Sequence, residues 1–527
     1  MAAPLFLIGF MAAGKTSVGR AIARETGRRF VDLDDVVAML GEPVATLLAR
    51  DEAEFRKREE SALASEIAAA LDDVVISTGG GAAAHGHNLE RMRRAGCVIA
   101  LAVDVDQARL RAGDGSGRPL LAKPAAQVAA LAAQRAPVYR RAHAVVDTNG
   151  RGIAEVAALV REAEAAWRAA PGDATTIVSL GARSYPVVVG ETFDAELIAG
   201  RLGKVSKLAV ITDQNVATHW IEALEAAIDP AVTLEIPPGE AHKTLATYQR
   251  LCDALIAQGL DRSSAIVALG GGVVGDLAGF VAATVFRGIP IVQLPTTIVA
   301  MTDAAIGGKT AVDTEAGKNL VGAFHQPRLV ACNLATLSTL PERERRAGFG
   351  ELWKYALLDG AALWALVDQC TSWARDGGEP TLALREVIAR AVAFKAAVVG
   401  RDELERTGQR ALLNLGHTVG HAIESQTGLL HGEAVGLGLV VACRVSHALG
   451  LAPTGLAKTV EAALGRTGLP HDPGAYLSEA VIARLQADKK RVGDHVRFIA
   501  VREVGACEPV EISLAELGRI LRSYSVA

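Results

Sequence analysis

The sequence lacks the features of a secreted, membrane or nucleic-acid-binding protein. Its 527 residues include six cysteines but no CxxC pair, which argues against a disulfide framework and a cysteine-ligated zinc site and favours a reducing cytoplasm. No apolar run approaches the ~20 residues of a membrane span, and the basic start of a secretory signal is missing. The net charge of -4 offers no basic face for phosphate backbones. We therefore expect a cytoplasmic protein that acts on small molecules, with no nucleic acid or membrane as partner.

The remaining composition is typical of a globular protein with several domains. Half the residues are apolar and 22% are charged, and the chain is too long for one core of ordinary size. A helical, alanine-rich stretch stops at Pro171-Gly172, and strand-like runs give way to helical periods near residue 340. The pattern predicts an α/β fold class. Residues 1–171 would form a parallel sheet with helices, 172–340 a Rossmann-like α/β part, and 341–527 a mainly α-helical part.

A glycine-bracketed loop near the start of the chain has the pattern of a phosphate-binding site. The stretch GFMAAGKT fits G-x-x-x-x-G-K-[ST], with Gly9, Gly14, Lys15 and Thr16 at the required places. An apolar run precedes the loop and a helical stretch follows, so backbone N–H groups at a helix N-terminus can hold an anion. Lys15 can reach the terminal phosphates, and the Thr16 hydroxyl can bind Mg²⁺. The alternative is an ordinary glycine turn between a strand and a helix.

Charged residues further along the chain indicate what receives the phosphate. Asp32 and Asp34 in RRFVDLDD stand two apart at the end of a strand-like run, so they point to one face. EFRKREE presents Arg58 on a helical stretch, VVISTGGG brings Gly80 to a strand end, and RAGDGSGRPLL carries Arg118 on a glycine-flanked loop. An arginine over the phosphates and another for a substrate carboxylate suit phosphoryl transfer to a small acid. Taken alone, the two aspartates also fit a solvated acidic turn.

These motifs occur together in one known family. GFMAAGKT, DLD, FRKRE, TGGG, RPLL and QRAPVY resemble shikimate kinase across roughly residues 1–165. The resemblance implies an ATP and Mg²⁺ site, with Thr16 and Asp32 at the metal, made by Gly9, Gly14, Lys15, Thr16, Ser17, Asp32 and Arg118. It implies a shikimate site made by Asp34, Arg58, Gly80 and Arg135. It implies catalytic roles for Lys15, Asp34 and Arg118. Ala12-Ala13 departs from the family's usual glycine, which we expect to be tolerated.

The second half of the chain contains a weaker nucleotide signal. AIVALGGGVVGDLAGF has G-x-G-x-x-G at Gly270, Gly272 and Gly275, after a strand-like run and before a helical one. Such a pattern also arises by chance in a glycine-rich chain. Asp213 and Asn215 in TDQNV lie at the end of an earlier strand-like run, where an acidic side chain can hold a ribose. Together these features favour a dinucleotide.

Histidines and lysines in the last third indicate a metal and an anionic substrate. His417 and His421 stand at i, i+4 on one helical face, and with His431 and Glu351 they have the composition of a catalytic metal site. His421 equally fits a core histidine or one beside the metal ligands. Lysines in apolar or glycine-rich surroundings suggest a phosphorylated or carboxylated substrate. These lysines are Lys309, Lys318, Lys354, Lys395, and Lys489 or Lys490.

The same stretches, from PPGEAHKT through TDAAIGGKTAVD to LHGEAV, resemble 3-dehydroquinate synthase across roughly residues 175–525. The resemblance implies Zn²⁺ (or Co²⁺) held by Glu351, His417 and His431. It implies an NAD site made by Asp213, Asn215, Glu240, Lys243, Gly271, Gly272, Asp276, Thr296, Thr297, Lys309 and Lys318. It implies a substrate site made by Asp303, Lys309, Asn319, Lys354, Lys395, Arg410, Asn414, His421 and Lys490, with Arg287 reaching in from the other subunit of a homodimer. Catalytic roles would fall to Lys309, Lys354, Asn414 and His421.

The two resemblances imply a bifunctional enzyme of the shikimate pathway. One half would phosphorylate shikimate at its 3-hydroxyl with ATP. The other would cyclise 3-deoxy-arabino-heptulosonate 7-phosphate to 3-dehydroquinate, releasing phosphate and regenerating NAD. Three alternatives remain open: another sugar-phosphate substrate for the second half, a catalytically silent regulatory half, and a metal-dependent alcohol dehydrogenase.

Two departures from the cyclase family concern the proposed metal site. The segment before His431 is shorter than is usual in the family. Phe349 and Trp353 replace the smaller residues that usually surround Glu351 and Lys354. Since both of the latter remain, we expect altered packing and intact chemistry.

Overall fold

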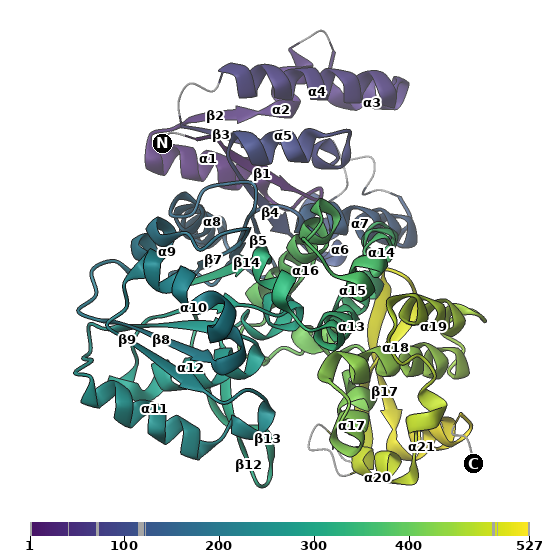
Figure 1. Ribbon diagram of the computed structural model, residues 1–527. Helices are drawn as coiled ribbons and strands as arrows, with labels where there is room; N and C mark the ends of the chain where they lie inside the picture. The colour runs from purple at the N-terminus through teal and green to yellow at the C-terminus, as the bar shows by residue number, and fades with distance from the viewer. Residues whose placement is uncertain are drawn as a thin grey trace. The chain divides into compact units, whose positions relative to one another are not determined.

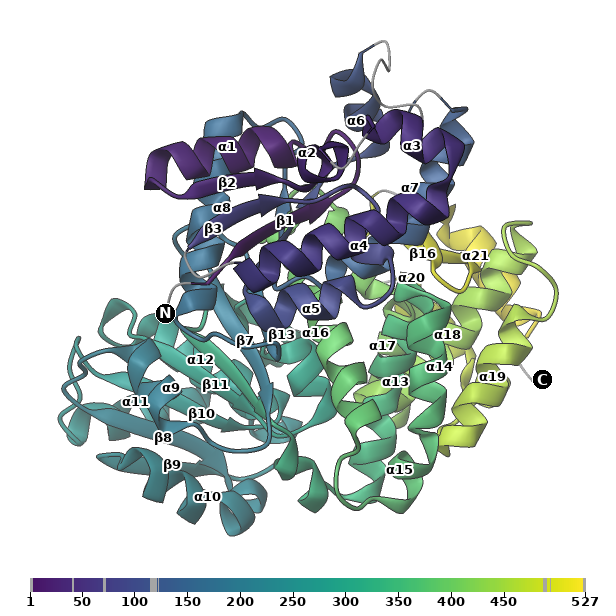
Figure 2. The same ribbon diagram turned by 90° about the horizontal axis from the view of Figure 1, so that it is seen from above.

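The chain forms two compact units, which are described separately below (Figures 1 and 2). The computed structural model describes residues 3–39, 42–69, 73–113, 121, 123–486, 491–492 and 494–524. The first unit is Met1–Val188 with Ala396–Glu403, and the second is Val189–Lys395 with Leu404–Ala527. The domain boundaries expected after residues 171 and 340 stay predictions. Among the described residues, no helix combines the length and apolar character needed to cross a bilayer.

The first unit is built on a five-stranded sheet in the order β2-β3-β1-β4-β5, in which all neighbours are parallel. Its strands are β1 (Leu5–Gly9), β2 (Arg29–Asp32), β3 (Val74–Ser77), β4 (Cys97–Ala102) and β5 (Ala144–Asp147). Its helices are α1 (Lys15–Thr26), α2 (Leu33–Ala38), α3 (Val44–Arg50), α4 (Glu52–Ala69), α5 (Asn88–Ala95), α6 (Val105–Ala112), α7 (Ala125–Arg140) and α8 (Ile153–Arg168), with a 3₁₀ turn, η1 (Ala82–Ala84). An antiparallel pair follows, β6 (Thr175–Val178) and β7 (Tyr185–Gly190).

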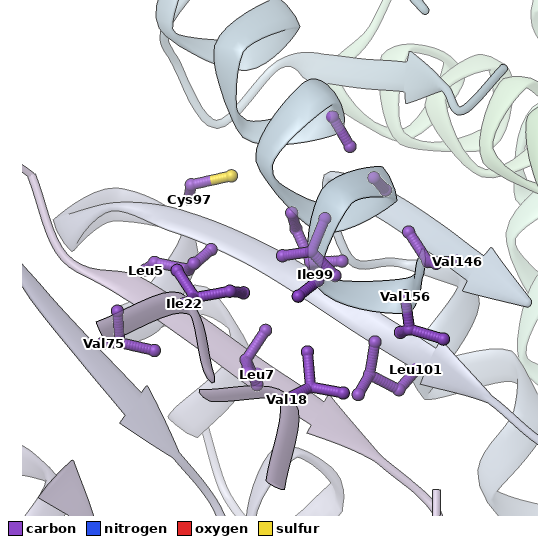
Figure 3. Close-up of a cluster of buried hydrophobic side chains, with 14 of the residues drawn as sticks. Leu5, Leu7, Val18, Ile22, Val75, Cys97, Ile99, Leu101, Val146 and Val156 are labelled. Carbon is purple, nitrogen blue, oxygen red and sulfur yellow. The ribbon is translucent and has the colours of Figure 1, made fainter. Parts of the chain in front are cut away.

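Helices cover both faces of this sheet, as a parallel sheet requires. Successive residues of β1 point to opposite faces, so Leu5 and Leu7 join one core and Phe6 and Ile8 the other. Figure 3 shows the first core, where side chains of α1 and α8 meet those of the sheet. Helices α2 to α5 contribute to the second core. The two layers fix the strand ends, from which the loops of the site emerge.

The α/β part of the second unit has five parallel strands in the order β14-β11-β10-β8-β9. They are β8 (Leu208–Asp213), β9 (Val232–Ile236), β10 (Ala265–Gly270), β11 (Ile291–Pro295) and β14 (Leu329–Asn333). The accompanying helices are α9 (Ala195–Leu202), α10 (Gln214–Ile228), α11 (Leu245–Ala257) and α12 (Gly272–Thr284), and the short turns are η2 (Glu240–His242), η3 (Val285–Arg287), η4 (Ala300–Ala304) and η5 (Leu334–Thr339). An antiparallel hairpin stands apart from the sheet, β12 (Lys309–Thr314) with β13 (Gly317–Phe324).

The remainder of the second unit is mainly helical. Its helices are α13 (Glu342–Asp359), α14 (Ala361–Gln369), α15 (Thr371–Asp376), α16 (Leu382–Arg401), α17 (His417–Thr427), α18 (His431–Ala448), α19 (Leu456–Thr467), α20 (Glu479–Gln486) and α21 (Leu514–Arg522), with the turns η6 (Gln409–Asn414) and η7 (Pro473–Tyr476). A small antiparallel sheet contains β15 (Arg491–Val492), β16 (His495–Glu503) and β17 (Ala506–Ser513). The predicted fold class is therefore confirmed: a parallel sheet with helices, then a Rossmann-like part, then a mainly helical part.

Helix α13 is buried on every side along its second half, as expected of a helix in the middle of a core. The two bulky residues that depart from the family pattern fill this core. The ring of Phe349 lies 6.4 Å from that of Trp373. The ring of Trp353 lies 4.6 Å from that of Trp364, and its indole donates to Thr467 at 3.0 Å. The bulk is absorbed by aromatic neighbours.

Glycines let α13, α17 and α18 approach more closely than side chains would allow. A Cβ at Gly432 in α18 would overlap the carbonyl oxygen of Ala347 in α13, and one at Gly350 would overlap the carbonyl of Gly432. A Cβ at Gly438 would overlap the carbonyl of Gly416, just before α17. The backbones are thus in direct contact, which brings the residues beside these glycines together.

Candidate active sites

The phosphate loop of the first unit connects β1 to α1 as predicted. The Lys15 ammonium, which is buried, donates to the carbonyl oxygens of Gly9 at 2.9 Å and Phe10 at 3.0 Å. The Thr16 hydroxyl donates to Asp32 Oδ2 at 2.7 Å. The two predicted Mg²⁺ residues therefore lie side by side, and a hydroxyl beside a carboxylate suits a hard cation such as Mg²⁺.

A cavity of about 320 Å³ opens beside this loop. It is lined by Ala12, Ala13, Gly14, Ser17, Val18, Arg111, Thr148, Arg151, Ile153 and Val156. Arg111 donates to the Thr148 hydroxyl at 2.9 Å, and Arg151 donates to Glu155 at 2.7 Å. The sequence argument singled out neither arginine, although Arg111 opens the stretch RAGDGSGRPLL and Arg151 stands between Gly150 and Gly152.

Acidic and basic side chains converge between α2, α4 and the loop after β3. Asp34 lies near Glu59, since a Cβ at Gly79 would press on both carboxylates. Burial raises the pKa of Asp34, and the neighbouring Asp32 adds to this. Glu59 is fully buried, which raises its pKa, and it accepts from Arg56 at 2.6 Å. The guanidinium of Arg56 therefore lies in a cluster with the carboxylates of Glu59 and Asp34.

The arginine in this cluster is Arg56, whereas the sequence pointed to Arg58. A Cβ at Gly81 would overlap the Arg56 guanidinium, which places Arg56 against the glycine loop. Arg58 instead pairs with Glu54 at 2.8 Å, one turn back on α4. Residues two apart on a helix point away from each other. The sequence spacing indicates Arg56, because Arg56 stands three residues before Glu59 and so lies on the same face of the helix. Arg58 does not share that face.

Other predicted residues of the first unit lie as follows. Arg135 donates to the carbonyl of Gly80 at 3.3 Å, and the Tyr139 hydroxyl donates to the same oxygen. Arg135 and the glycine loop are therefore together. Ser17 is exposed and lines the cavity beside the phosphate loop. Arg118, the expected arginine over the phosphates, lies outside the described residues.

In the second unit, the predicted dinucleotide residues gather at the carboxyl ends of the parallel strands, where such sheets bind ligands. Asp213 ends β8 and caps α10, accepting from the backbone of Asn215 at 3.0 Å. Gly271 joins β10 to α12, and Gly272 is the first residue of α12. A Cβ at Gly271 would approach the Thr297 side chain, next to Thr296, at the end of β11. Because these glycines have no side chain, a ligand can approach the protein backbone at this point.

A buried lysine lies beside this strand edge. Lys243 donates to Asp276 at 2.8 Å and lies 3.5 Å from Glu240. Burial alone would lower the pKa of Lys243, but Asp276 and Glu240 outweigh it and raise the pKa. Lys318 on β13 also reaches Glu240, at 3.8 Å. These four residues of the predicted NAD site thus form one charge-paired group.

A second group of buried charges joins α13, α16 and η4. The Lys354 ammonium lies 2.5 Å from Glu351 Oε2 and 3.7 Å from Asp303 Oδ1. Lys395 donates to the same Asp303 oxygen at 2.6 Å. Burial alone would lower the pKa of Lys354, but Glu351 and Asp303 raise it; burial of Lys395 lowers its pKa to about 8. Tyr355 completes the group by donating to Asp303 at 3.3 Å.

Three donor groups meet at the first residues of α17 and α18 and the middle of α13. Glu351 Oε1 lies 3.4 Å from His417 Nε2 and 3.2 Å from His431 Nε2. One ligand atom from each lies within 4.8 Å of the others. The short segment before His431 therefore still brings it to Glu351. A carboxylate and two imidazoles fit Zn²⁺ and leave a coordination position for another ligand.

The histidine tautomers agree with this fit. The Nδ1 atom of His417 is 3.0 Å from the Leu415 carbonyl oxygen, and that of His431 is 3.1 Å from Glu424. An acceptor at Nδ1 requires the proton there, which leaves the Nε2 lone pair of each ring facing Glu351. The rings of His417 and His421 lie 5.1 Å apart, and His421 is exposed. His421 therefore lies beside the donors.

The remaining predicted substrate residues lie as follows. Lys309 pairs with Glu405, and Arg410, which is buried, lies 3.5 Å from the same carboxylate. Asn319 donates its backbone N–H to Asp313 at 2.9 Å, and Asn414 ends η6. The exposed Arg287 closes η3 with φ 70°. Lys489 and Lys490 lie outside the described residues. Glu405 and Glu424 were missed, because nothing in their local sequence marks a carboxylate as a lysine partner.

Comparison with known families agrees with both halves. Residues 233–347 match the family model of 3-dehydroquinate synthase N-terminal, and residues 348–491 match that of 3-dehydroquinate synthase C-terminal. Residues 11–163 match the family model of shikimate kinase. The matches follow one another along the chain and do not overlap.

Individual relatives agree with this division. The 3-dehydroquinate synthase of Caulobacter vibrioides is 45% identical over 347 residues, covering 63% of this chain and 93% of that protein. A crystal structure of 2-deoxy-scyllo-inosose synthase complexed with carbaglucose-6-phosphate, NAD⁺ and Co²⁺ is 27% identical, with a TM-score of 0.57, covering 66% of this chain and 100% of that one. ValA, a 2-epi-5-epi-valiolone synthase from Streptomyces hygroscopicus subsp. jinggangensis 5008 with NAD⁺ and Zn²⁺ bound, is 27% identical, with a TM-score of 0.57, covering 64% and 96%. The chain belongs to the 3-dehydroquinate synthase family, carries a shikimate kinase domain ahead of that part, and is a bifunctional enzyme of the shikimate pathway.

Proposed function

We propose that the first unit transfers phosphate from ATP to the 3-hydroxyl of shikimate. We propose that the second converts 3-deoxy-arabino-heptulosonate 7-phosphate to 3-dehydroquinate with release of phosphate. The observation that carries the second assignment is the set of the buried Glu351 and His417 with the partly exposed His431, next to Lys354 and the Asp303 carboxylate. An anionic sugar that must lose phosphate needs cations close to a metal and a dinucleotide. The arrangement offers lysine cations directly beside the proposed metal ligands.

In the kinase half, the nucleotide would lie in the cavity beside the phosphate loop. The guanidinium groups of Arg111 and Arg151 line that cavity, and arginine stacks well on flat aromatic rings such as adenine. Mg²⁺ neutralises charge on the transferring phosphate, and Thr16 with Asp32 would hold it. Lys15 would exchange its backbone acceptors for phosphate oxygens.

The shikimate site would use the cluster of Asp34, Arg56 and Arg135. We assign the carboxylate of shikimate to Arg56 and Arg135, which both border the glycine loop. Asp34 would accept a hydrogen bond from the reacting hydroxyl, and its raised pKa suits a group that takes a proton. Glu59 would hold Arg56 in place.

In the cyclase half, NAD would lie at the strand ends beside Asp213, Lys243 and Gly271. Zn²⁺ and NAD would supply, respectively, polarisation of a substrate hydroxyl and a reversible store for hydride. Lys354 and Lys395 would orient the anionic substrate. His421, exposed beside the metal ligands, would carry a proton between substrate positions.

A different sugar phosphate is the second candidate substrate, because the two solved structures above are synthases named for other products. Those structures are 27% identical to this chain, whereas the 3-dehydroquinate synthase relative is 45% identical. The identities favour the heptulosonate phosphate. A panel of heptulose and hexose phosphates would separate the two assignments.

The test is phosphate release from 3-deoxy-arabino-heptulosonate 7-phosphate by the full chain with a trace of NAD, before and after metal removal by a chelator. We expect one phosphate per substrate, loss of activity on chelation, recovery with Zn²⁺ and no net NADH. No release by folded, metal-loaded protein would refute the cyclase assignment. Accumulating NADH would instead indicate a dehydrogenase.

We further propose a homodimer formed through the cyclase half, with Arg287 of one subunit near the other subunit's site. Support comes from the exposure of Arg287 at a strained turn, where Phe286 and Arg287 both have positive φ. Sedimentation of the full chain would test the dimer, and a monomer at working concentration would contradict it. We also propose a cytoplasmic location, since all six cysteines are free thiols.

A further inference from the structure

The two histidines at the metal site are held in different ways. His417 is buried, its side chain is 8% exposed, and its Nδ1 bonds to the Leu415 carbonyl within the same stretch of backbone. The side chain of His431 is 31% exposed, and its Nδ1 bonds to the side chain of Glu424. The orientation of His417 is therefore fixed by the fold around it. On the Nδ1 side, the ring of His431 is held by a side-chain carboxylate alone, while its Nε2 faces Glu351.

The Glu424 carboxylate is itself fixed at both oxygens. Its Oε2 faces His431 Nδ1 at 3.1 Å, and its Oε1 accepts from the Lys318 ammonium at 2.7 Å. The side chain is 16% exposed, so its charge is only partly screened by water. Lys318 comes from the β12–β13 hairpin, while Glu424 comes from α17. One carboxylate thus connects the hairpin to a metal ligand.

We propose that Glu424 is a positioning residue for the metal centre, which fixes the tautomer and ring orientation of His431 without binding the metal. A carboxylate that accepts Nδ1–H keeps the Nε2 lone pair available and makes the imidazole a stronger donor. Without it, the half-exposed ring can rotate or move its proton to Nε2, and either change removes a metal ligand. This inference rests on the metal site proposed above.

The competing interpretation is that Glu424 binds a cation of its own. His421, Glu424 and His431 also offer three ligand atoms within 4.8 Å of one another. His431 would then bridge two ions. The number of ions per chain separates the two interpretations, because a positioning residue leaves it at one.

Metal-free full chain should be titrated with Zn²⁺ in competition with a chromophoric chelator, without NAD or substrate. We compare wild type, Glu424→Gln, Glu424→Ala and a control, Glu461→Gln. Glu461 pairs with Arg444 at 2.8 Å. Arg444 lies on α18 about 20 Å from His431, from the rise per residue of an α-helix. The control removes a partly buried carboxylate that pairs with the same helix.

We expect one Zn²⁺ per chain in all four proteins. Glu424→Ala should bind it about 10- to 100-fold more weakly, Glu424→Gln by less because it keeps an acceptor, and the control within about twofold. The absorption spectrum of Co²⁺-loaded Glu424→Ala should differ from wild type, whereas the unfolding midpoints of the metal-free proteins should agree. Zn²⁺ affinity of Glu424→Ala within twofold of wild type would overturn the proposal. A second Zn²⁺ that wild type binds and Glu424→Ala does not would also overturn it. A wild-type chain that binds no Zn²⁺ would instead refute the metal site itself.

Discussion

The lysines of the two proposed sites are held in different ways. In the first, Lys15 is the first residue of α1 and donates to backbone carbonyls of the loop before it. In the second, the buried Lys354 and Lys395 lie on helices and pair with carboxylates, Lys354 mainly with Glu351 and Lys395 with Asp303. Lys15 can move to a phosphate by giving up two backbone acceptors. A lysine of the second site that turns to a substrate leaves its carboxylate in need of a partner, so the second site must rearrange as a group.

The largest effects are expected when one key side chain is removed from each unit. Lys15→Ala should reduce shikimate phosphorylation about 100-fold or more, because a cation at the transferring phosphate is lost. His417→Ala should reduce cyclisation by at least as much, because a proposed metal ligand is lost. Each variant should keep the other activity within about twofold, as measured by two separate assays on one preparation. Loss of both activities in a folded variant would contradict independent sites.

The next effect concerns the two arginines of α4. Arg56→Ala should lower kcat/KM for shikimate about 10- to 100-fold, because a charged hydrogen bond to a carboxylate is worth about 1.5–3 kcal/mol. Arg58→Ala removes only a partly exposed pair with Glu54 and should change kcat/KM less than about twofold. Steady-state kinetics on both variants decides between them. The reverse ranking would restore Arg58 as the substrate arginine.

A smaller effect should appear in the pH profile of the cyclase. Lys395 has a pKa of about 8, set by burial, with Asp303 raising it and Arg410 and Lys354 lowering it. Above that pH it loses its charge, so kcat/KM for an anionic substrate should fall by up to about tenfold per pH unit. Lys395→Arg, which stays charged, should remove that step. For stability the sign is opposite: the folded state binds fewer protons than the unfolded one between about pH 8 and 10.5, so stability from this group rises with pH there.

A profile for wild type that stays flat to about pH 9.5 would show that Lys395 does not titrate in this range. A fall of equal size in Lys395→Arg would assign the step to another group.

The smallest effect is expected in the phosphate loop. Ala12 has φ 59°, in the left-handed region that costs a non-glycine residue about 1–2 kcal/mol. Ala12→Gly removes that strain but adds unfolded-state entropy, so we expect a net gain of about 0.5–1 kcal/mol for the first unit. Ala13, which is buried in the core, is the matched control, and Ala13→Gly should destabilise. Denaturant unfolding followed by kinase activity would measure both.

The sequence predicted the local parts of both sites and not the side-chain pairing. The phosphate loop and the strand-end glycines could be found because their residues are consecutive. Composition suggested a metal site, but the resemblance selected the proposed ligands, since Glu351 and His431 are 80 residues apart and helix packing joins them. Arg56 was passed over although its spacing from Glu59 favoured it. Glu405 and Glu424 could not be found, because their partners come from the distant β12–β13 hairpin.

The glycine contacts between α13, α17 and α18 affect how this protein tolerates substitution. Gly350, Gly416 and Gly432 each adjoin a proposed metal ligand in the chain, and the first and last leave no room for a methyl group. In a saturation-mutagenesis scan scored by cyclase function, Gly350 and Gly432 should therefore be as intolerant as the ligands, although neither binds anything. Gly200, a helical glycine with open space around it, should accept alanine. A scan read without the structure would overcount the catalytic residues.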